Sequence, residues 1–106
     1  MKQETLNRIK KFTEDRNWDQ FHTGANLAKG LAIEASEVLE LFLWQEEPTS
    51  MEDLADELGD VLVYVTYLCD KYNFDMDTIV NNKMDKNEKK YPVEKSYGKS
   101  TKYNKL

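Results

Sequence analysis

The sequence predicts an all-α fold, a bundle of four helices. Apolar residues recur at intervals of three and four over long stretches, and no segment alternates with period two over a useful length. Gly and Pro are scarce, at 4 and 2 of 106 residues, and 40% of the chain is hydrophobic. A chain of this length can form one hydrophobic core. We therefore expect a single domain over residues 1–106, with 93–106, rich in Lys, Ser and Tyr, as a loose tail.

The first helix is predicted from about Lys2 to Asp15. Leu6, Ile9 and Phe12 recur every three residues and form a narrow apolar stripe. The following segment, 16–25, is aromatic and polar, lacks helical periodicity and contains a glycine. It therefore links the first helix to the second.

The second helix is predicted from Asn26, as its N-cap, to about Gln45, before Pro48. Ala28, Ala32 and Ala35 allow a neighbouring helix to approach closely. The expected core face consists of Leu27, Leu31, Val38, Leu41 and Phe42.

Two further helices complete the predicted bundle. Ser50 caps the third, with Asp53 three residues on as in a capping box, and the helix continues to about Tyr72. Its apolar residues are Leu54, Leu58, Val61, Leu62, Val65 and Leu68. The fourth helix is predicted over Met76–Lys90 and ends before Pro92, because the residue before proline disfavours the α conformation.

Two acidic pairs interrupt the apolar faces of the second and third helices. These pairs are Glu34 with Glu37 and Glu57 with Asp60. A spacing of three places both carboxylates of a pair on one helix surface, so two packed helices gather all four. Two such charges about 4 Å apart repel by roughly 4 kcal/mol at an effective dielectric constant near 20. Oxygen ligands favour Mg²⁺, with Mn²⁺ as a substitute, over zinc.

A solvated helix face is the common explanation for any single glutamate. Here the position argues otherwise, because Glu34 lies between Leu31 and Val38, and the second pair also adjoins leucines. A charge in such surroundings needs a partner or a shifted pKa. We expect a shared cation to meet that need.

Composition excludes several functions. A net charge of −5 argues against broad nucleic-acid binding. Lys83, Lys86, Lys89 and Lys90 cluster near the C-terminus, as a solvated face or as a contact for a metal-chelated polyanion. The one cysteine, Cys69, permits no intrachain disulfide and is expected to be buried. The N-terminus lacks an apolar stretch and no segment is long enough to span a membrane, so we expect a cytoplasmic protein.

Several motifs occur together in an order known from one family. They are Glu34-x-x-Glu37 and Glu57-x-x-Asp60, Arg16–His22, Asn26-Leu27, Glu40–Trp44, Asp60–Tyr64, Lys83–Asn87 and Lys90–Pro92. On these motifs the chain resembles the MazG-type nucleoside triphosphate pyrophosphohydrolases, most closely the branch that includes the dCTP pyrophosphatases. The match extends along nearly the whole chain.

The resemblance implies Mg²⁺-dependent cleavage of a nucleotide, such as dCTP or a modified cytosine nucleotide, to its monophosphate and pyrophosphate. The metal ligands and catalytic residues would be Glu34, Glu37, Glu57 and Asp60. Trp18, His22, Trp44 and Tyr64 would hold the nucleoside, and Lys83 and Asn87 would approach the phosphates. A homotetramer built as a dimer of dimers is also implied, and apolar residues on more than one helix face agree with an oligomer.

Departures from the family pattern leave the preferred base open. They are Gly24 for a frequent Pro, Ser36 for a Gly, Leu43 for a Gln, and Ile9 where some relatives have His. His22 can act as a general base, a donor in the base pocket or a loop anchor, and the number of metal ions is not fixed. Two other functions remain: an all-α diphosphatase acting on dUTP or another nucleotide, and a nonenzymatic acidic helical module. Carboxylates set between leucines favour an enzyme.

Overall fold

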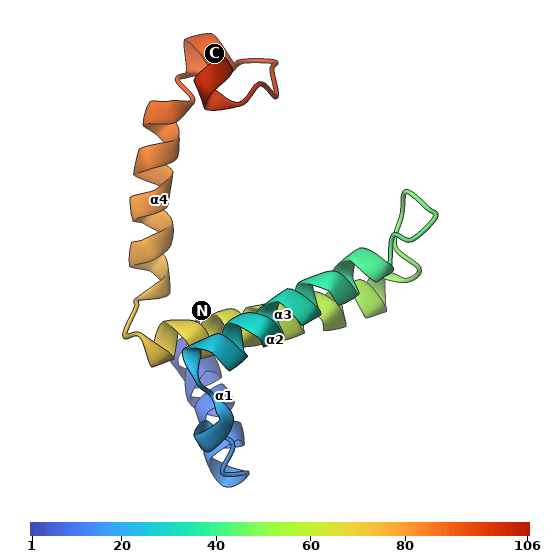
Figure 1. The fold of residues 1–106 in the computed structure, drawn as a ribbon, viewed down its shortest axis with the longest axis vertical. Coiled ribbons are helices and arrows are strands. Elements are labelled where there is room, and N and C mark those ends of the chain that lie inside the picture. The colour runs from blue at the N-terminus through green and yellow to red at the C-terminus, as the bar shows by residue number, and fades with distance from the viewer. The chain divides into compact units, whose positions relative to one another are not determined.

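The structure, a computed structural model, describes all residues 1–106 and is helical throughout, with no strand (Figure 1). Its long helices are α1 (Gln3–Asp15), α2 (Gly24–Glu40), α3 (Met51–Lys71) and α4 (Met76–Lys90). Its short elements are the 3₁₀ turn η1 (Asp19–Phe21), helix α5 (Val93–Ser96) and the 3₁₀ turn η2 (Tyr103–Lys105). The prediction of an all-α fold is confirmed.

The chain divides into two compact units, Met1–Asn73 and Phe74–Leu106. The first contains α1, α2 and α3, and the second contains α4 and the two short C-terminal elements. The packing of four helices into one bundle and the single domain over 1–106 therefore remain predictions. So does the loose tail at 93–106, although that segment forms α5 and η2.

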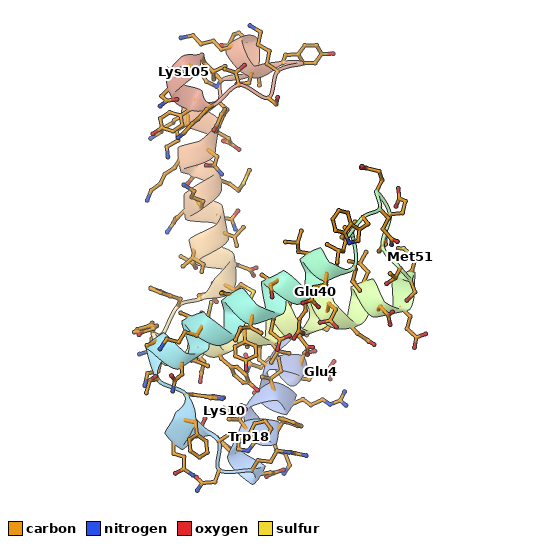
Figure 2. The ribbon with its side chains drawn as sticks, turned by 45° about the vertical axis from the view of Figure 1, so that its right-hand side comes forward. Glu4, Lys10, Trp18, Glu40, Met51 and Lys105 are labelled. Atoms are coloured by element: carbon orange, nitrogen blue, oxygen red, sulfur yellow. The ribbon has the colours of Figure 1, made fainter.

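Helices α2 and α3 pack against each other as an antiparallel pair (Figure 1). Two glycines of α2 make room for tyrosines: a Cβ at Gly30 would overlap the ring of Tyr64 on α3, and a Cβ at Gly24 would overlap Tyr72, the residue that follows α3. In Figure 2, Glu40 and Met51 are labelled on either side of the segment that joins the two helices. This helix pair forms the frame of the candidate site.

Side-chain caps fix the starts of the helices. Ser50 accepts a hydrogen bond from the Asp53 N–H at 3.0 Å, which confirms the predicted cap of α3. The predicted start of α2 was wrong, because the N-cap is Thr23, whose Oγ1 accepts from the Asn26 N–H at 3.1 Å. Asn26 lies inside the helix instead. A threonine hydroxyl is a competent cap, and the predicted cap residue is its hydrogen-bond donor.

Helix α2 also ends earlier than the predicted Gln45, at Glu40. The next amides bond three residues back, from Leu41 to Val38 and from Phe42 to Leu39, so the helix tightens and stops. Trp44 then adopts a left-handed conformation with φ 66°, which no α-helix continues. The apolar spacing beyond Glu40 misled the prediction because it does not report backbone handedness.

Few side chains are buried within a single chain. The buried apolar residues are Leu27 and Cys69, and the buried polar ones are Thr13 and Thr66. Burial of Cys69 confirms its prediction. Two members of the expected core, Leu58 and Leu62, are instead 45% and 50% exposed. They lie on α3 surfaces that a single chain leaves uncovered.

Candidate active site

Four carboxylates from two helices meet at one place. Each of Glu34, Glu37, Glu57 and Asp60 offers one oxygen, and these oxygens all lie within 4.8 Å of one another. The first two come from α2 and the last two from α3, so the helix pairing brings the two acidic motifs together. Asp60 is exposed and the three glutamates are partly buried.

Two oxygens of this cluster are buried without a hydrogen-bond partner, Glu34 Oε2 and Glu57 Oε2. Burial, together with the neighbouring carboxylates, raises the pKa of Glu34 from 4.5 to about 7. A proton shared with Glu37 is the main cause that raises the pKa of Glu57, and burial adds to it. The raised pKa values mean that Glu34 and Glu57 are harder to ionise than usual, as expected for crowded like charges.

The donor set fits a hard divalent cation. All four donors are carboxylate oxygens, with no histidine or cysteine among them, which suits Mg²⁺ or Mn²⁺ better than zinc. Ligands on opposite sides of a Mg²⁺ ion lie about 4 Å apart, since each Mg–O distance is about 2.1 Å. A spread of up to 4.8 Å is close to that value. The two unpartnered oxygens are free to accept such an ion.

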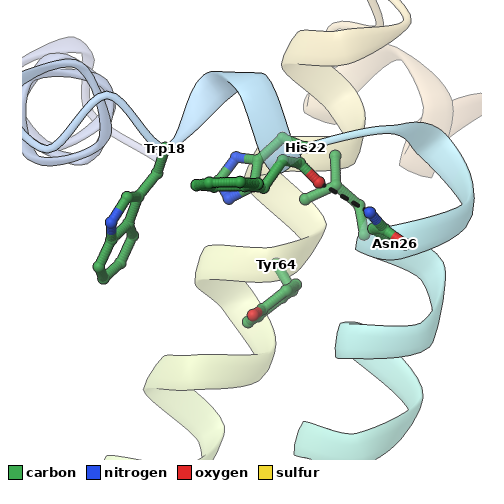
Figure 3. Close-up of a pocket in the computed structure, with 6 residues that line it drawn as sticks. Trp18, His22, Asn26 and Tyr64 are labelled. Carbon is green, nitrogen blue, oxygen red and sulfur yellow. Dashed lines mark hydrogen bonds between the residues drawn. The ribbon is translucent and has the colours of Figure 1, made fainter.

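A cavity of about 290 Å³ opens beside the helix pair. Its walls are formed by Trp18, Phe21, His22, Asn26, Leu27 and Tyr64. Figure 3 shows His22 and Tyr64 facing each other across the cavity, with Trp18 at its edge. The cavity wall is mainly aromatic, and its polar groups include the His22 imidazole, the Asn26 amide and the Tyr64 hydroxyl. Such walls suit a flat heterocycle.

The segment between α1 and α2 supplies much of this wall. A 3₁₀ turn places Trp18 and Phe21 at its start and end, and the Trp18 ring packs edge-on against Phe12 at 5.5 Å. The Arg16 guanidinium lies 3.7 Å from the centre of the Phe12 ring. The Asn26 side chain donates to the Phe21 carbonyl oxygen at 2.9 Å, which ties the turn to α2 (Figure 3).

Tyr64 connects the cavity to the carboxylate cluster. It lines the cavity, and burial, followed by the charge of Glu34, raises its pKa. Asp60 and Tyr64 are four residues apart on α3, so this part of the cavity wall lies about one helical turn, roughly 6 Å along the helix, from the nearest carboxylate of the cluster. A ligand with a planar ring at one end and phosphates at the other can span that distance.

Of the residues predicted to hold a nucleoside, Trp18, His22 and Tyr64 lie together in the cavity, whereas Trp44 does not. Trp44 follows the C-terminal end of α2 and is 94% exposed. The helix alone separates Asn26, which lines the cavity, from Glu40, the last residue of α2, by about 20 Å at 1.5 Å per residue. Trp44 lies beyond Glu40 in the sequence. A role for Trp44 at the pocket of its own chain is not supported, and its contribution to a neighbour's pocket remains a prediction.

The residues predicted to approach the phosphates, Lys83 and Asn87, lie on α4 in the second unit, one turn apart. Their role remains a prediction. Sequence reasoning did not assign Phe21, Asn26 or Leu27 to the site, although all three belong to motifs that carried the resemblance. Their closeness to Trp18 and His22 in the sequence was the signal that could have assigned them to the cavity.

Comparison with known proteins agrees with this geometry. A MazG-like family profile matches residues 29–106. dCTP pyrophosphatase 1 from Rattus norvegicus is 36% identical over 90% of this chain and 61% of its own length, and that from Homo sapiens is 35% identical over the same shares. The chain thus spans about three fifths of the curated relatives it matches. A crystal structure of a pyrophosphatase from Archaeoglobus fulgidus superposes with a TM-score of 0.80 at 35% identity, covering 84% of this chain and 90% of the other.

The fold and the site define an all-α protein with a cluster of four carboxylates between two antiparallel helices and an aromatic cavity beside it. The chain belongs to the MazG-like family. The predicted family is confirmed. No helix has the length and apolar character needed to cross a membrane.

Proposed function

We propose that this protein is a Mg²⁺-dependent nucleoside triphosphate pyrophosphohydrolase that produces a nucleoside monophosphate and pyrophosphate. The observation that carries the proposal is the meeting of four carboxylates within 4.8 Å of one another, about one helical turn from the Tyr64 wall of an aromatic cavity. The relatives named dCTP pyrophosphatase support the same reaction class. They also make dCTP, or a modified cytosine nucleotide, the first substrate to test.

In this proposal the four carboxylates hold the metal beside the phosphates. A divalent ion bound there supplies an activated water and neutralises charge that develops on the phosphoryl oxygens. The glutamates set its position, because each pair is fixed three residues apart on a rigid helix. Their crowding keeps the empty cluster unfavourable and so favours occupation by a cation.

The cavity orients the nucleotide. Aromatic stacking contributes roughly 1 to 3 kcal/mol per base, and Trp18, Phe21 and Tyr64 offer ring surfaces for it. His22 is the titratable side chain of the cavity wall opposite Tyr64. We assign it to the base rather than to water activation, because it lines the cavity and is absent from the carboxylate cluster.

A homo-oligomer, with the tetramer as the predicted form, belongs to the same proposal. Large apolar side chains at and beyond the C-terminal end of α2 are exposed, among them Leu39 at 71%, Trp44 at 94% and Met51 at 71%. Large apolar side chains exposed to this extent are typical of surfaces that a partner covers. A neighbouring chain that covers them can also place Trp44 at a pocket other than its own.

The test is a product assay with purified protein. dCTP, 5-methyl-dCTP, dUTP, dTTP, dATP and dGTP are each incubated with Mg²⁺, with Mn²⁺ and with chelator, and nucleotide products are separated by chromatography. Pyrophosphate and orthophosphate are measured separately. We expect monophosphate and pyrophosphate in equal amounts from a cytosine nucleotide, and no turnover with chelator. Diphosphate with orthophosphate would exclude cleavage between the α- and β-phosphates, and preference for dUTP would favour the alternative diphosphatase.

A further inference from the structure

Tyr67 is an aromatic residue behind the cavity wall rather than in it. It lies on α3, three residues after Tyr64, and is absent from the residues that line the cavity. Its ring nevertheless contacts two that do: His22 with centroids 4.6 Å apart and Tyr64 with centroids 5.6 Å apart. Tyr67 is therefore placed to determine how both rings face the cavity.

The hydroxyl end of Tyr67 is fixed by another helix. Thr13, on α1, is 2% exposed, and its Oγ1 lies 3.1 Å from the Tyr67 hydroxyl and 3.2 Å from the Ile9 carbonyl oxygen. A carbonyl oxygen only accepts hydrogen bonds, so the Thr13 hydroxyl donates to the Ile9 carbonyl oxygen. The Tyr67 hydroxyl can then donate to the Thr13 oxygen, so that each hydroxyl hydrogen makes one bond. A buried partner of this kind holds the ring in one orientation, because an unmade bond there is costly.

The geometry of the two ring contacts differs. Tyr67 and Tyr64 are nearly perpendicular, at 83°, as in an edge-to-face pair, whereas Tyr67 and His22 are tilted by 47°. A rotation of the Tyr67 ring would change both contacts at once. Since the two contacted rings lie on opposite sides of the cavity, that rotation would alter the width between them (Figure 3).

We propose that Tyr67, held by Thr13, is a positioning residue that fixes His22 and Tyr64 in the orientations required to hold a nucleoside base. The inference rests on the proposed function for its kinetic consequence, but the positioning itself concerns the ligand-free protein. It gives α1, which supplies no residue to the cavity wall, a part in substrate recognition.

The chain offers a matched control. Thr66, on α3, is also buried, at 6% exposure, and its hydroxyl also donates to a carbonyl four residues back, that of Leu62 at 2.8 Å. Thr66 does not line the cavity, and the second neighbour of its hydroxyl is the Met1 Sδ at 3.9 Å rather than the Tyr67 hydroxyl. Thr13→Val and Thr66→Val thus remove equivalent helical hydrogen bonds, and only the first removes the bond to Tyr67.

The first measurement uses the single histidine as a probe. The imidazole ¹H–¹³C signals of His22 are compared in the ligand-free wild type, Thr13→Val, Tyr67→Phe and Thr66→Val. We expect the His22 chemical shifts to move by more than the line width in Thr13→Val and Tyr67→Phe, because the orientation of the Tyr67 ring determines the shielding at His22. We expect no such movement in Thr66→Val. If Thr13→Val fails to fold, Tyr67→Phe, which keeps the ring, decides. Unchanged His22 signals in Tyr67→Phe would overturn the proposal.

The second measurement is steady-state turnover of the best nucleotide with Mg²⁺. Loss of the hydroxyl contact should raise KM about 3- to 10-fold with kcat within about twofold, because the residue acts on binding geometry and not on the reacting atoms. Thr66→Val should keep the wild-type KM. A KM unchanged in Tyr67→Phe contradicts positioning, whereas a wild type that hydrolyses no nucleotide contradicts the proposed function and leaves the His22 signals to decide the positioning.

Discussion

Glu34 Oε2 on α2 and Glu57 Oε2 on α3 are both buried and both lack a hydrogen-bond partner, within a cluster whose donor oxygens lie at most 4.8 Å apart. Buried polar atoms without partners are uncommon, and two of equal charge side by side are costly. The helix pair is therefore held together against local repulsion at the point where a cation would remove that repulsion.

The first prediction concerns pH and metal. The pKa of Glu34 in the folded chain is raised to about 7 from 4.5, so the folded state binds more protons than the unfolded state between these values. Stability of the metal-free protein should therefore fall as pH rises through this window. In Glu34→Gln that fall should be smaller. Melting temperatures of both proteins in chelator, from about pH 5 to about pH 8, measure the difference.

Added Mg²⁺ should act in the opposite direction. Ligands must be ionised to bind, so the ion should raise the melting temperature strongly at about pH 8 and little at about pH 5. A wild-type stabilisation by Mg²⁺ that is the same at both pH values would show that Glu34 is not a ligand.

The second prediction concerns single ligands. Glu37→Gln and Asp60→Asn should each lower kcat by at least about 100-fold, because even partners that only orient ligands are worth 10 to 100-fold. Neither should unfold the protein, since loss of one charge relieves repulsion. Glu40→Gln on α2 and Asp70→Asn on α3 are exposed controls on the same helices and should keep wild-type rates. Near-normal turnover of both ligand variants at saturating Mg²⁺ would refute the assignment.

The third prediction compares two helical glycines. A Cβ at Gly30 would overlap the Tyr64 ring, so Gly30→Ala should cost about 1 to 3 kcal/mol of stability and widen the cavity. Gly59 has no atom within 4 Å of an added Cβ, so Gly59→Ala should stabilise α3 by up to about 1 kcal/mol. Chemical denaturation of both variants measures the contrast. Equal effects of the two substitutions would mean that the Tyr64 contact carries no weight.

The fourth prediction concerns Trp44. A buried tryptophan truncated to alanine costs about 3 to 5 kcal/mol, but Trp44 is 94% exposed in the chain. Trp44→Ala should therefore leave the unfolding free energy of a single chain almost unchanged while it weakens nucleotide binding at a neighbour's pocket. Denaturation midpoints in dilute solution are compared with nucleotide dissociation constants. A large stability loss with unchanged nucleotide binding would place Trp44 in a structural contact only.

The fifth prediction concerns assembly. Light scattering at micromolar protein should give four times the 12.5 kDa mass of one chain. Leu39→Glu, at a position 71% exposed, should shift the mass towards the monomer and lower activity. A fully active 12.5 kDa species would refute both the oligomer and the shared pocket.

The sequence predicted the helices because a helix depends on the local spacing of its apolar residues and on the residues that cap its ends. The predicted α4, Met76–Lys90, matches the structure, and α3 is capped by Ser50 as expected. The end of α2 was not predictable in the same way: Leu41 and Phe42 keep the apolar spacing, but their amides bond three residues back and end the helix at Glu40, before the left-handed residue Trp44. Side-chain spacing carries no information on that change.

The site was predictable in part for the same reason. Two acidic pairs at a spacing of three identified the cluster, because residues three apart lie on the same face of a helix. The contacts of Tyr67 with Thr13 and His22 were missed. They join three separate segments of the chain and leave no periodic signature. Only the packing of α1 against α3 reveals them.

The caps and pairing of α2 and α3 also determine which insertions and deletions the chain can accept. One extra residue between Gly30 and Glu34 would turn the following part of α2 by about 100° and carry both of its carboxylates away from those of α3. Extra residues in 45–49, outside both helices, would lengthen a surface connection and leave the pairing intact. Length variation among proteins that keep this site should therefore concentrate between the two acidic motifs and avoid the helical turns that contain them.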